Sequence, residues 1–420
     1  MPSTRLISAT LVLVLTQVSV AGDWPAFRGP DGTGLSNEKN VPMKWSPTEN
    51  IKWKAALPAP GNGSPIVSKG KVFVTVATEK GKKRSLLCFD RKTGEKLWAK
   101  DVIFEGDEPT HGTNPIGSST PVADGERIVV WHSSAGVVCY DYEGNELWKR
   151  DLGVFRHIWG YGQSAVILGD SVILNCGPGV RTFVTALDRK TGETLWQTDE
   201  PGGDAGLESV DGKRAPWIGS WSTPVIIRVE GQPQILVSFP HHANAYDPKT
   251  GKILWTCDGL GDLVYTSPVI GDGVAVTMGG FHGPAIAFKL GGSGNVTETN
   301  RLWQIKPGNP QRIGSGVILG KHLFMANAGP PIAQCIVVET GEDLWKERMP
   351  GNDNWGSMIH ADGRLYVTNQ AGATNVIAPN PAKFELLATN ELGENSNSTP
   401  AFSDGQIFLR TFKHLWSIGE

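Results

Sequence analysis

The chain alternates between short apolar stretches and tight polar turns, and this alternation repeats along most of its length. Each repeat opens with a small hydroxyl residue, often followed by proline, and continues through hydrophobic residues, a glycine turn and a β-branched run, a pattern typical of β-strands. The opening residues lie 42 to 59 positions apart and are Ser64, Thr120, Ser164, Thr223, Ser267, Ser315, Ser357 and Thr399. Eight copies at so short a period favour one closed ring of sheets over independent domains.

A second phrase, Asp-x-x-Thr-Gly followed by Trp, closes most of the repeats. It occurs, in order of decreasing clarity, at 90–98, 188–196, 247–255, 141–148, 340–345 and, stretched by a Gly-rich insertion, 288–303. Asp and Thr side chains can hydrogen-bond nearby backbone amides and Gly supplies a positive φ, so the phrase predicts a tight turn between two strands. The Trp is a large apolar group that needs a cover, and in a ring the neighbouring sheet provides it.

The two ends of the chain predict how the ring closes. Each repeat indicates four strands, which in the first copy span 65–68, 72–77, 85–89 and 96–100. The eighth copy ends after its third strand, whereas residues 50–54 form a spare strand that carries Trp53. Pairing these ends would remove the exposed strand edges. We therefore predict an all-β fold, an eight-bladed β-propeller of four-stranded blades over residues 50–420, closed by the N-terminal strand.

The N-terminal segment predicts export. A short start with Arg5 precedes an apolar run from Leu6 to Val20 and the small residues before Gly22, which is the pattern of a secretory signal peptide over residues 1–21. No Cys follows that would anchor a bacterial lipoprotein, and no other stretch is long and apolar enough to span a bilayer. We expect a periplasmic or secreted protein in which residues 22–49 form an irregular extension.

Composition and charge exclude some classes of function. Lys plus Arg is 39 and Asp plus Glu is 42, which gives a net charge of −3, too close to neutral for an electrostatically driven nucleic-acid binder. Gly (52) and Pro (28) make up about a fifth of the chain without a collagen-like period, as many tight turns require. The five cysteines are dispersed and odd in number, so they indicate neither a disulfide framework nor a zinc or haem motif.

The repeat resembles the tryptophan-docking motif of pyrroloquinoline-quinone (PQQ)-type eight-bladed propellers, and the stretch Asp23–Pro30 is similar to the opening of secreted bacterial PQQ-repeat proteins. That resemblance implies one of two functions. Some members are quinoprotein dehydrogenases, whereas BamB-like members are propellers without a cofactor, and a fold alone does not choose between them.

Two repeats depart from the motif. The sixth has Val337 at the turn Asp, and the seventh, 376–392, lacks Asp, Thr-Gly and Trp, which predicts different packing of its outer strand. Cys88, Cys139 and Cys335 precede the turn by two positions, where other repeats have Ala, and are expected to be small core residues.

Long loops on one face of the ring are the predicted place for a ligand site. The connections from the fourth strand of one repeat to the first of the next are long, and functional residues concentrate on such loops. With the loops between second and third strands, they supply Arg156, His157, Trp159, Tyr161, Trp217, Trp221, His241, His242, His282, Arg312 and Trp355. Aromatic rings with Arg and His suit a small anionic, aromatic ligand, by stacking and charge-assisted hydrogen bonds. The alternative is that these aromatic residues cap the channel and pack loop against loop.

Metal and catalytic residues are not identified by the sequence. His241 and His242 would point to opposite sides of an extended segment, so they would not readily share one metal ion. Acidic residues on the same face could supply a Ca²⁺ site or a general base and are Glu105, Asp107, Glu108, Glu200, Asp204, Glu208, Asp262 and Asp353. No nucleophile elbow, phosphate loop or zinc-protease motif is present in the sequence.

The sequence thus predicts a monomeric propeller that acts as a binding or scaffold module for a protein partner or an envelope ligand. The alternative is a PQQ- and Ca²⁺-dependent alcohol or sugar oxidoreductase. Against it, the chain lacks the adjacent cysteines that the resemblance implies for the alcohol-oxidising branch, and it lacks a haem motif. A third possibility, carbohydrate binding, depends on the Trp- and Asn-rich loops.

Overall fold

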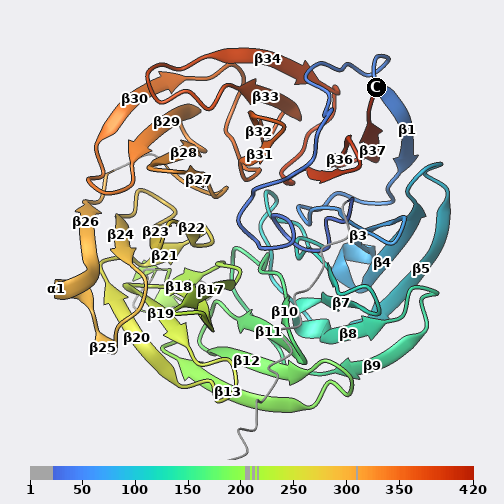
Figure 1. The fold of residues 1–420 in the computed structure, drawn as a ribbon. Helices are drawn as coiled ribbons and strands as arrows, with labels where there is room; N and C mark the ends of the chain where they lie inside the picture. Colours follow the sequence, from blue (N-terminus) through green and yellow to red (C-terminus); the bar gives the residue numbers. More distant parts are fainter. Residues whose placement is uncertain (1–21, 204–208, 211–212, 215–216, 309–310) are drawn as a thin grey trace, which may run out of the picture.

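Eight small sheets surround a central axis in the computed structural model, which describes residues 22–203, 209–210, 213–214, 217–308 and 311–420 (Figure 1). Blade 1 contains β2 (Ile66–Ser68), β3 (Lys71–Thr78), β4 (Lys83–Asp90) and β5 (Lys96–Ile103), and blade 2 contains β6 (Val122–Ala123), β7 (Ile128–Trp131), β8 (Val137–Tyr140) and β9 (Glu146–Arg150). Blade 3 contains β10 (Val166–Leu168), β11 (Ser171–Cys176), β12 (Thr182–Asp188) and β13 (Thr194–Glu200), and blade 4 contains β17 (Val225–Val229), β18 (Gln232–Phe239), β19 (His242–Tyr246) and β20 (Ile253–Asp258).

The second half of the ring follows the same plan of antiparallel neighbours. Blade 5 contains β22 (Val269–Gly271), β23 (Val274–Met278), β24 (Ala285–Lys289) and β26 (Arg301–Ile305), and blade 6 contains β27 (Val317–Leu319), β28 (His322–Ala326), β29 (Ile332–Val337) and β30 (Asp343–Arg348). Blade 7 contains β31 (Ile359–Ala361), β32 (Arg364–Thr368), β33 (Ala373–Ile377) and β34 (Leu386–Glu391), and blade 8 contains β35 (Ala401–Ser403), β36 (Gln406–Arg410), β37 (His414–Ile418) and β1 (Ile51–Ala56). The predicted eight-bladed, all-β propeller is confirmed.

The N-terminal strand closes the ring as predicted. Strand β1 pairs antiparallel with β37, from Ile51 opposite Ile418 to Ala56 opposite His414, so the two ends of the chain complete blade 8 (Figure 1). The pairing removes the edge of β37 that a chain without β1 would expose.

The Asp-x-x-Thr-Gly turns form for the reason that the sequence indicates. In blade 1, Asp90 Oδ1 accepts hydrogen bonds from the backbone N–H groups of Lys92 and Thr93, at 2.9 and 2.8 Å, and Gly94 has a φ of 73°. The N–H of Thr93 is the main cause that lowers the pKa of Asp90. The three cysteines at the preceding core position, Cys88, Cys139 and Cys335, are fully buried and have raised pKa values, because burial disfavours the thiolate.

Most blades are joined by a tryptophan that docks on the next blade. The indole Nε1–H donates to a backbone carbonyl of that blade at 2.7–3.2 Å in Trp53, Trp98, Trp148, Trp196, Trp303 and Trp345. The rings also cover the turn glycines, and a Cβ on Gly94 would lie 2.5 Å from the ring of Trp53. Each of these joints therefore combines apolar burial with one directional hydrogen bond.

Two joints differ, and at each of them another segment of the chain takes part: the insertion of blade 5 at one and the N-terminal extension at the other. The Gly-rich insertion of blade 5 supplies β25 (Gly294–Asn295), which runs parallel to β20, and the short helix α1 (Thr297–Asn300). Beside them the Trp255 side chain is fully buried, and its Nε1–H bonds to Gln234 Oε1 of its own blade. Blade 7, which lacks a docking Trp, is packed instead by the N-terminal extension. There the Trp45 side chain is buried, and the backbone N–H of Trp45 donates to Asn390 Oδ1 of β34 at 2.9 Å.

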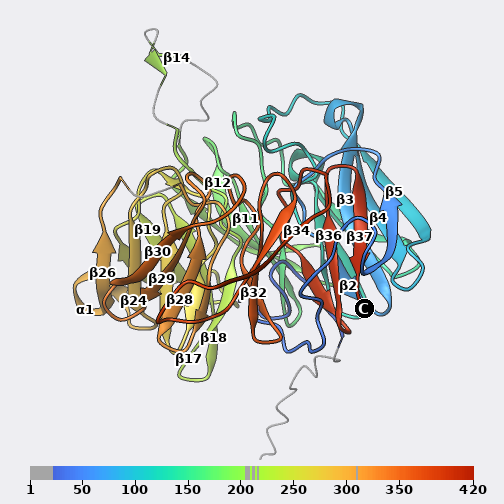
Figure 2. The same ribbon diagram turned by 90° about the horizontal axis from the view of Figure 1, so that it is seen from above.

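Residues 22–49, here called the strap, cross the ring on the face opposite the long loops. The strap pairs with blade 1 at Trp24 and Val67, accepts a hydrogen bond from Ala123 of blade 2 at Pro25 O, and continues to blade 7, where the N–H of His360 bonds to Gly34 O at 2.8 Å. Figure 2 shows the dark blue strap along the lower edge of the ring. Blade 2 faces blade 6 across the axis, and the strap contacts both, at Ala123 through Pro25 O and at Gly316 O through Arg28 Nη2, so it must pass over the end of the channel.

Candidate functional site

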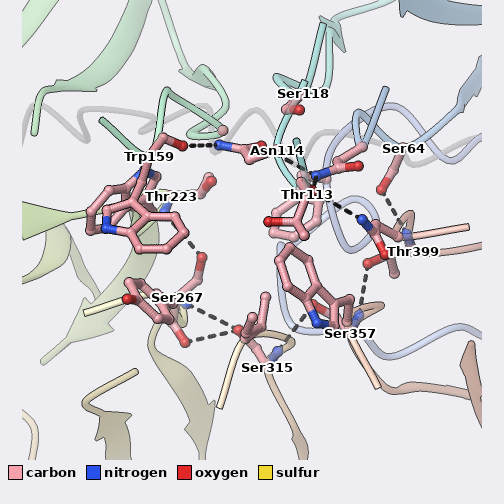
Figure 3. Close-up of a pocket in the computed structure, with 18 of the residues that line it drawn as sticks. Ser64, Thr113, Asn114, Ser118, Trp159, Thr223, Ser267, Ser315, Ser357 and Thr399 are labelled. Carbon is pink, nitrogen blue, oxygen red and sulfur yellow. Dashed lines mark hydrogen bonds between the residues drawn. The ribbon is translucent and has the colours of Figure 1, made fainter. Parts of the chain in front are cut away.

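The channel opens on the long-loop face into a cavity of about 560 Å³. This volume lies within the range of small-molecule sites. The cavity is bounded by loops from all around the ring and contains the axis of the propeller (Figure 3). We call it the channel cavity.

Aromatic side chains form much of the wall. They come from the loops before blades 3, 4, 5 and 7 and from within blade 5, and they are Trp159, Trp217, Trp221, Tyr265, Phe281 and Trp355. Several contact one another edge to face: ring centroids are 5.4 Å apart for Trp159 and Trp217, and 5.1 Å apart for Trp221 and Tyr265. Such contacts hold the rings in fixed orientations. The flat apolar ring surfaces that face the cavity are therefore already positioned before any ligand binds.

Amide side chains tie the loops of the opposite wall together. Asn62 and Asn397 each donate from Nδ2 to the carbonyl of Thr113, at 2.9 and 3.1 Å. Asn114 Nδ2 donates to Trp159 O at 2.7 Å, which joins the amide wall to the aromatic wall (Figure 3). Four neighbouring loops are thereby linked around the mouth.

A ring of hydroxyl residues lies deeper in the channel. The eight residues that open the sequence repeats bond in a closed circle: the N–H of each donates to the hydroxyl oxygen of the next, at 2.9–3.1 Å, and Thr399 N–H completes the circle at Ser64 Oγ. We call this ring the hydroxyl belt. Seven of its members line the cavity, and Figure 3 shows six of them around it: Ser64, Thr223, Ser267, Ser315, Ser357 and Thr399. Each oxygen accepts within the belt, and its O–H proton is left to donate to a further acceptor, which for Ser315 is Ser267 O at 3.2 Å.

The cavity is electrically neutral over its described surface. Among the described residues, the lining includes hydroxyls, amides, His111 and aromatic rings, but no Lys, Arg, Asp or Glu. Such a lining selects for uncharged ligands, since a charge brought from water without a partner carries a desolvation cost of several kcal/mol, about the cost of burying an unpaired ion.

A buried ion pair anchors the loop that supplies His111, Thr113 and Asn114. The side chains of Arg84 on β4 and Glu108 in this loop are 1% and 2% exposed, and Arg84 Nη1 lies 3.1 Å from Glu108 Oε2. Glu108 also accepts from Ser133 Oγ at 2.6 Å and from Ser134 N at 3.0 Å. The carboxylate is thus fully hydrogen-bonded, as a buried charge requires.

His132 beside this pair makes stability depend on pH. Burial, and then the nearby charges of Arg84 and Lys149, lower the pKa of His132 to about 3. The folded state therefore disfavours the protonated ring, so this contribution is complete above the unfolded pKa of about 6.5 and is lost as the pH falls from there toward 3. We expect the free energy of unfolding to fall by up to about 1.4 kcal/mol per pH unit in that window. Urea denaturation of the native chain and of His132→Asn between pH 7 and 4.5 measures this, and an equal pH slope in both would contradict it.

The structure places the residues predicted from the sequence in different settings. Trp159, Trp217, Trp221 and Trp355 line the cavity. Behind them, Nδ1 of buried His157 accepts a hydrogen bond from the backbone N–H of Trp159 at 3.2 Å. The imidazole ring also contacts Trp221, with ring centroids 4.9 Å apart. Tyr161 is buried as well, and its hydroxyl donates to Pro178 O at 3.2 Å. These two residues support the aromatic wall from behind.

The two predicted arginines do not lie in the lining. Arg156 is 57% exposed and its Nη2 lies 3.7 Å from Asp107 Oδ2. Arg312 is buried, its Nη1 donates to Gly283 O at 3.3 Å, and burial lowers its pKa to about 10. The described cavity therefore has no cationic group for the anionic ligand that the sequence suggested.

The predicted histidines are also apart from the cavity lining. His241 has a φ of 72° and lies in a turn rather than an extended segment, whereas His242 begins β19. Their side chains diverge: His241 Nε2 is 3.6 Å from Asp262 Oδ1, and His242 Nε2 is 3.4 Å from Glu200 Oε2. His282 is exposed next to Phe281, with ring centroids 4.5 Å apart.

No metal centre is found within the described part of the chain, where no group of three or more His, Cys, Asp or Glu side chains is placed to hold an ion. The acidic residues that the sequence offered as Ca²⁺ ligands are dispersed. Glu108 is held by Arg84, and Glu200 accepts the Tyr246 hydroxyl and Asn244 Nδ2. Asp204 and Glu208 lie outside the described residues, as does the predicted signal peptide.

These features define a propeller whose channel opens on one face into a cavity that has no charged side chain among its described lining residues. The sequence matches the profile of the family described as outer membrane protein assembly factor BamB, over residues 34–158 and 180–306. The matched segments cover more than half of the chain, and the protein belongs to this family of PQQ-like repeat propellers. A search of curated proteins finds no match.

Solved structures with the same fold include dehydrogenases and a BamB. The chain is similar to a quinohemoprotein alcohol dehydrogenase from Comamonas testosteroni, with a TM-score of 0.69 and 14% identity over 95% of this chain and 81% of that one. A europium-containing methanol dehydrogenase gives 0.66 and 13% over 93% and 89%, and BamB from Moraxella catarrhalis gives 0.59 and 12% over 88% and 99%. At these identities the likeness shows the fold alone.

The cofactor that the family name implies does not fit the described cavity. PQQ is a flat quinone with three carboxylates, which require cationic hydrogen-bond donors, and a Ca²⁺ ion beside it requires carboxylate or carbonyl oxygens. The described lining includes neither a cationic nor an acidic side chain. The described residues of this cavity therefore provide no site for PQQ chemistry.

Within the described part of the chain, no helix has the length and apolar character needed to cross a bilayer.

Proposed function

We propose that this protein is an exported binding module for neutral carbohydrate, which it takes up in the channel cavity. The observation that supports the proposal is the pairing of aromatic walls with hydroxyl and amide groups in a described lining without charged side chains. A sugar ring has an apolar C–H face, which packs on an aromatic ring, and a rim of hydroxyls, which exchange hydrogen bonds with amides and hydroxyls. Export, inferred from residues 1–21, is part of the same proposal and would place the protein among envelope or extracellular glycans.

Titration with neutral oligosaccharides tests the proposal. The probes are linear glucans, mannans and chitin fragments of two to six units, followed by calorimetry and by the fluorescence of the wall tryptophans. We expect saturable binding to at least one series, and Trp159→Ala should weaken it about tenfold or more, because a stacking surface is removed. Trp345→Phe is the matched control, since Trp345 docks blade 6 on blade 7 away from the cavity lining and its loss should leave the affinity unchanged.

Charged probes separate this proposal from the alternatives. Oligogalacturonate should bind more weakly than its neutral counterparts, because the described lining offers no cation. Saturable binding of PQQ with Ca²⁺, accompanied by dye-linked oxidation of an alcohol or sugar, would replace the proposal with a quinoprotein oxidoreductase. Failure of every neutral glycan to bind would refute it outright.

A further inference from the structure

The channel cavity has a floor that the blades do not supply. Phe27 belongs to its lining although the strap, which carries Phe27, lies on the opposite face of the ring. The strap reaches Val67 and Ala123 in blades 1 and 2 just before Phe27, and Gly316 in blade 6 just after it. Blade 2 and blade 6 are diametrically opposed in a ring of eight, so the residues between these contacts cross the axis. The Phe27 ring therefore stands at the inner end of the channel, beside the hydroxyl belt.

The floor is held in place on both sides. Pro25 O accepts the N–H of Ala123 at 2.8 Å. On the other side, Arg28 is 1% exposed, and its Nη2 donates to Gly316 O and Thr33 O, each at 2.6 Å. Gly316 follows the belt residue Ser315, so the guanidinium ties the strap directly to the inner strand of blade 6. The backbone that carries Phe27 is therefore held on both sides where it crosses the axis.

We infer that the channel cavity binds the terminus of a glycan chain and excludes its interior. This inference depends on the proposed function and deepens it. An open channel or a surface groove lets a polysaccharide pass through, but a cavity entered from one face and closed by Phe27 admits only an end. Its volume of about 560 Å³ gives room for about two or three sugar rings. The first ring reaches the belt hydroxyls and Phe27, and the next rings lie between the aromatic wall and the amide wall.

Stoichiometry against chain length tests the inference on the unmodified protein. Calorimetry is performed with the neutral glycan series that binds, at two to ten units, and with a cyclic member such as cyclomaltohexaose for an α-glucan. We expect affinity per chain to rise until about three units and then stay constant, with one protein bound per chain at every length. The cyclic glycan, which has no end, should bind at least tenfold more weakly than the linear hexamer.

The outcomes separate this inference from the function on which it depends. Absence of binding by every neutral glycan overturns both. Binding in which the number of proteins per chain grows with length, or in which the cyclic glycan binds as well as the linear one, overturns the chain-end inference and leaves carbohydrate binding intact. Phe27→Ala opens the far end of the channel, so long linear chains should thread through it and bind more than one protein per chain, whereas Pro30→Ala, at an exposed strap residue, should leave one protein per chain.

Discussion

Replacement of residues 50–56 by a Gly-Ser segment of equal length should leave the protein without a cooperative thermal transition above room temperature. The segment keeps the strap connected but removes β1, so β37 stays paired with β36 but loses its outer partner and exposes an unpaired edge. It also removes Trp53, which is 9% exposed, contacts Phe408 and bonds to Arg91 O in blade 1 at 2.9 Å. Loss of a buried Trp alone costs about 3–5 kcal/mol, against a total stability of about 5–15 kcal/mol for a folded domain.

Calorimetry and size-exclusion chromatography measure this outcome, and aggregation through the open β37 edge is the expected accompaniment. Lys52→Ser is the matched control, since Lys52 lies on the exposed side of the same strand and its replacement should shift the melting temperature little. A variant without β1 that melts at the native temperature as a monomer would show that the ring does not need this closure.

The propeller could be predicted from the sequence because its information is local and repeated eight times. A hydroxyl residue, a glycine turn and a docking Trp recur in register, and the mismatch between a missing final strand and a spare initial one fixes the closure. The loss of the motif at 376–392 correctly indicated a different packing there. Its cover, Trp45 in the strap, could not be predicted, since nothing in an irregular segment specifies where it lies.

The candidate site was predictable only in its aromatic part. Trp159, Trp221 and Trp355 belong to long loops whose face follows from blade topology. Arg156 and Arg312 lie on loops of the same kind, but whether a loop side chain faces the axis, a neighbouring loop or solvent depends on contacts between distant segments. Phe27 had no signal at all, because its place depends on a strap that crosses the ring. The hydroxyl belt did have a signal, the Ser or Thr that opens every repeat. An interpretation of these residues as a ring of inter-blade acceptors would have found the polar inner part of the site.

Removal of the Glu108 carboxylate should cause the second large effect, on stability and on ligand binding together. In Glu108→Ala the Arg84 guanidinium, 1% exposed, loses its counter-charge but stays buried, which costs about 3–5 kcal/mol. Ser133 Oγ and Ser134 N lose their acceptor as well. The loop that carries Thr113 and Asn114 is then tethered less firmly to blade 1, so the amide wall of the cavity should also lose its fixed geometry.

A double variant distinguishes this effect from the loss of a favourable contact. Arg84→Met combined with Glu108→Leu removes both charges, and should recover most of the stability that Glu108→Ala loses, because it is the unpaired buried charge that is costly. The control is Glu105→Ala in the same loop: its pair with Lys82 is largely exposed, so its loss should cost at most about 1 kcal/mol. If Glu108→Ala and Glu105→Ala lower the urea midpoint equally, the buried pair does not anchor the loop. If the double variant is stable but its glycan affinity stays reduced, the polar contacts of Glu108 to Ser133 and Ser134, rather than the charge pair, position the amide wall.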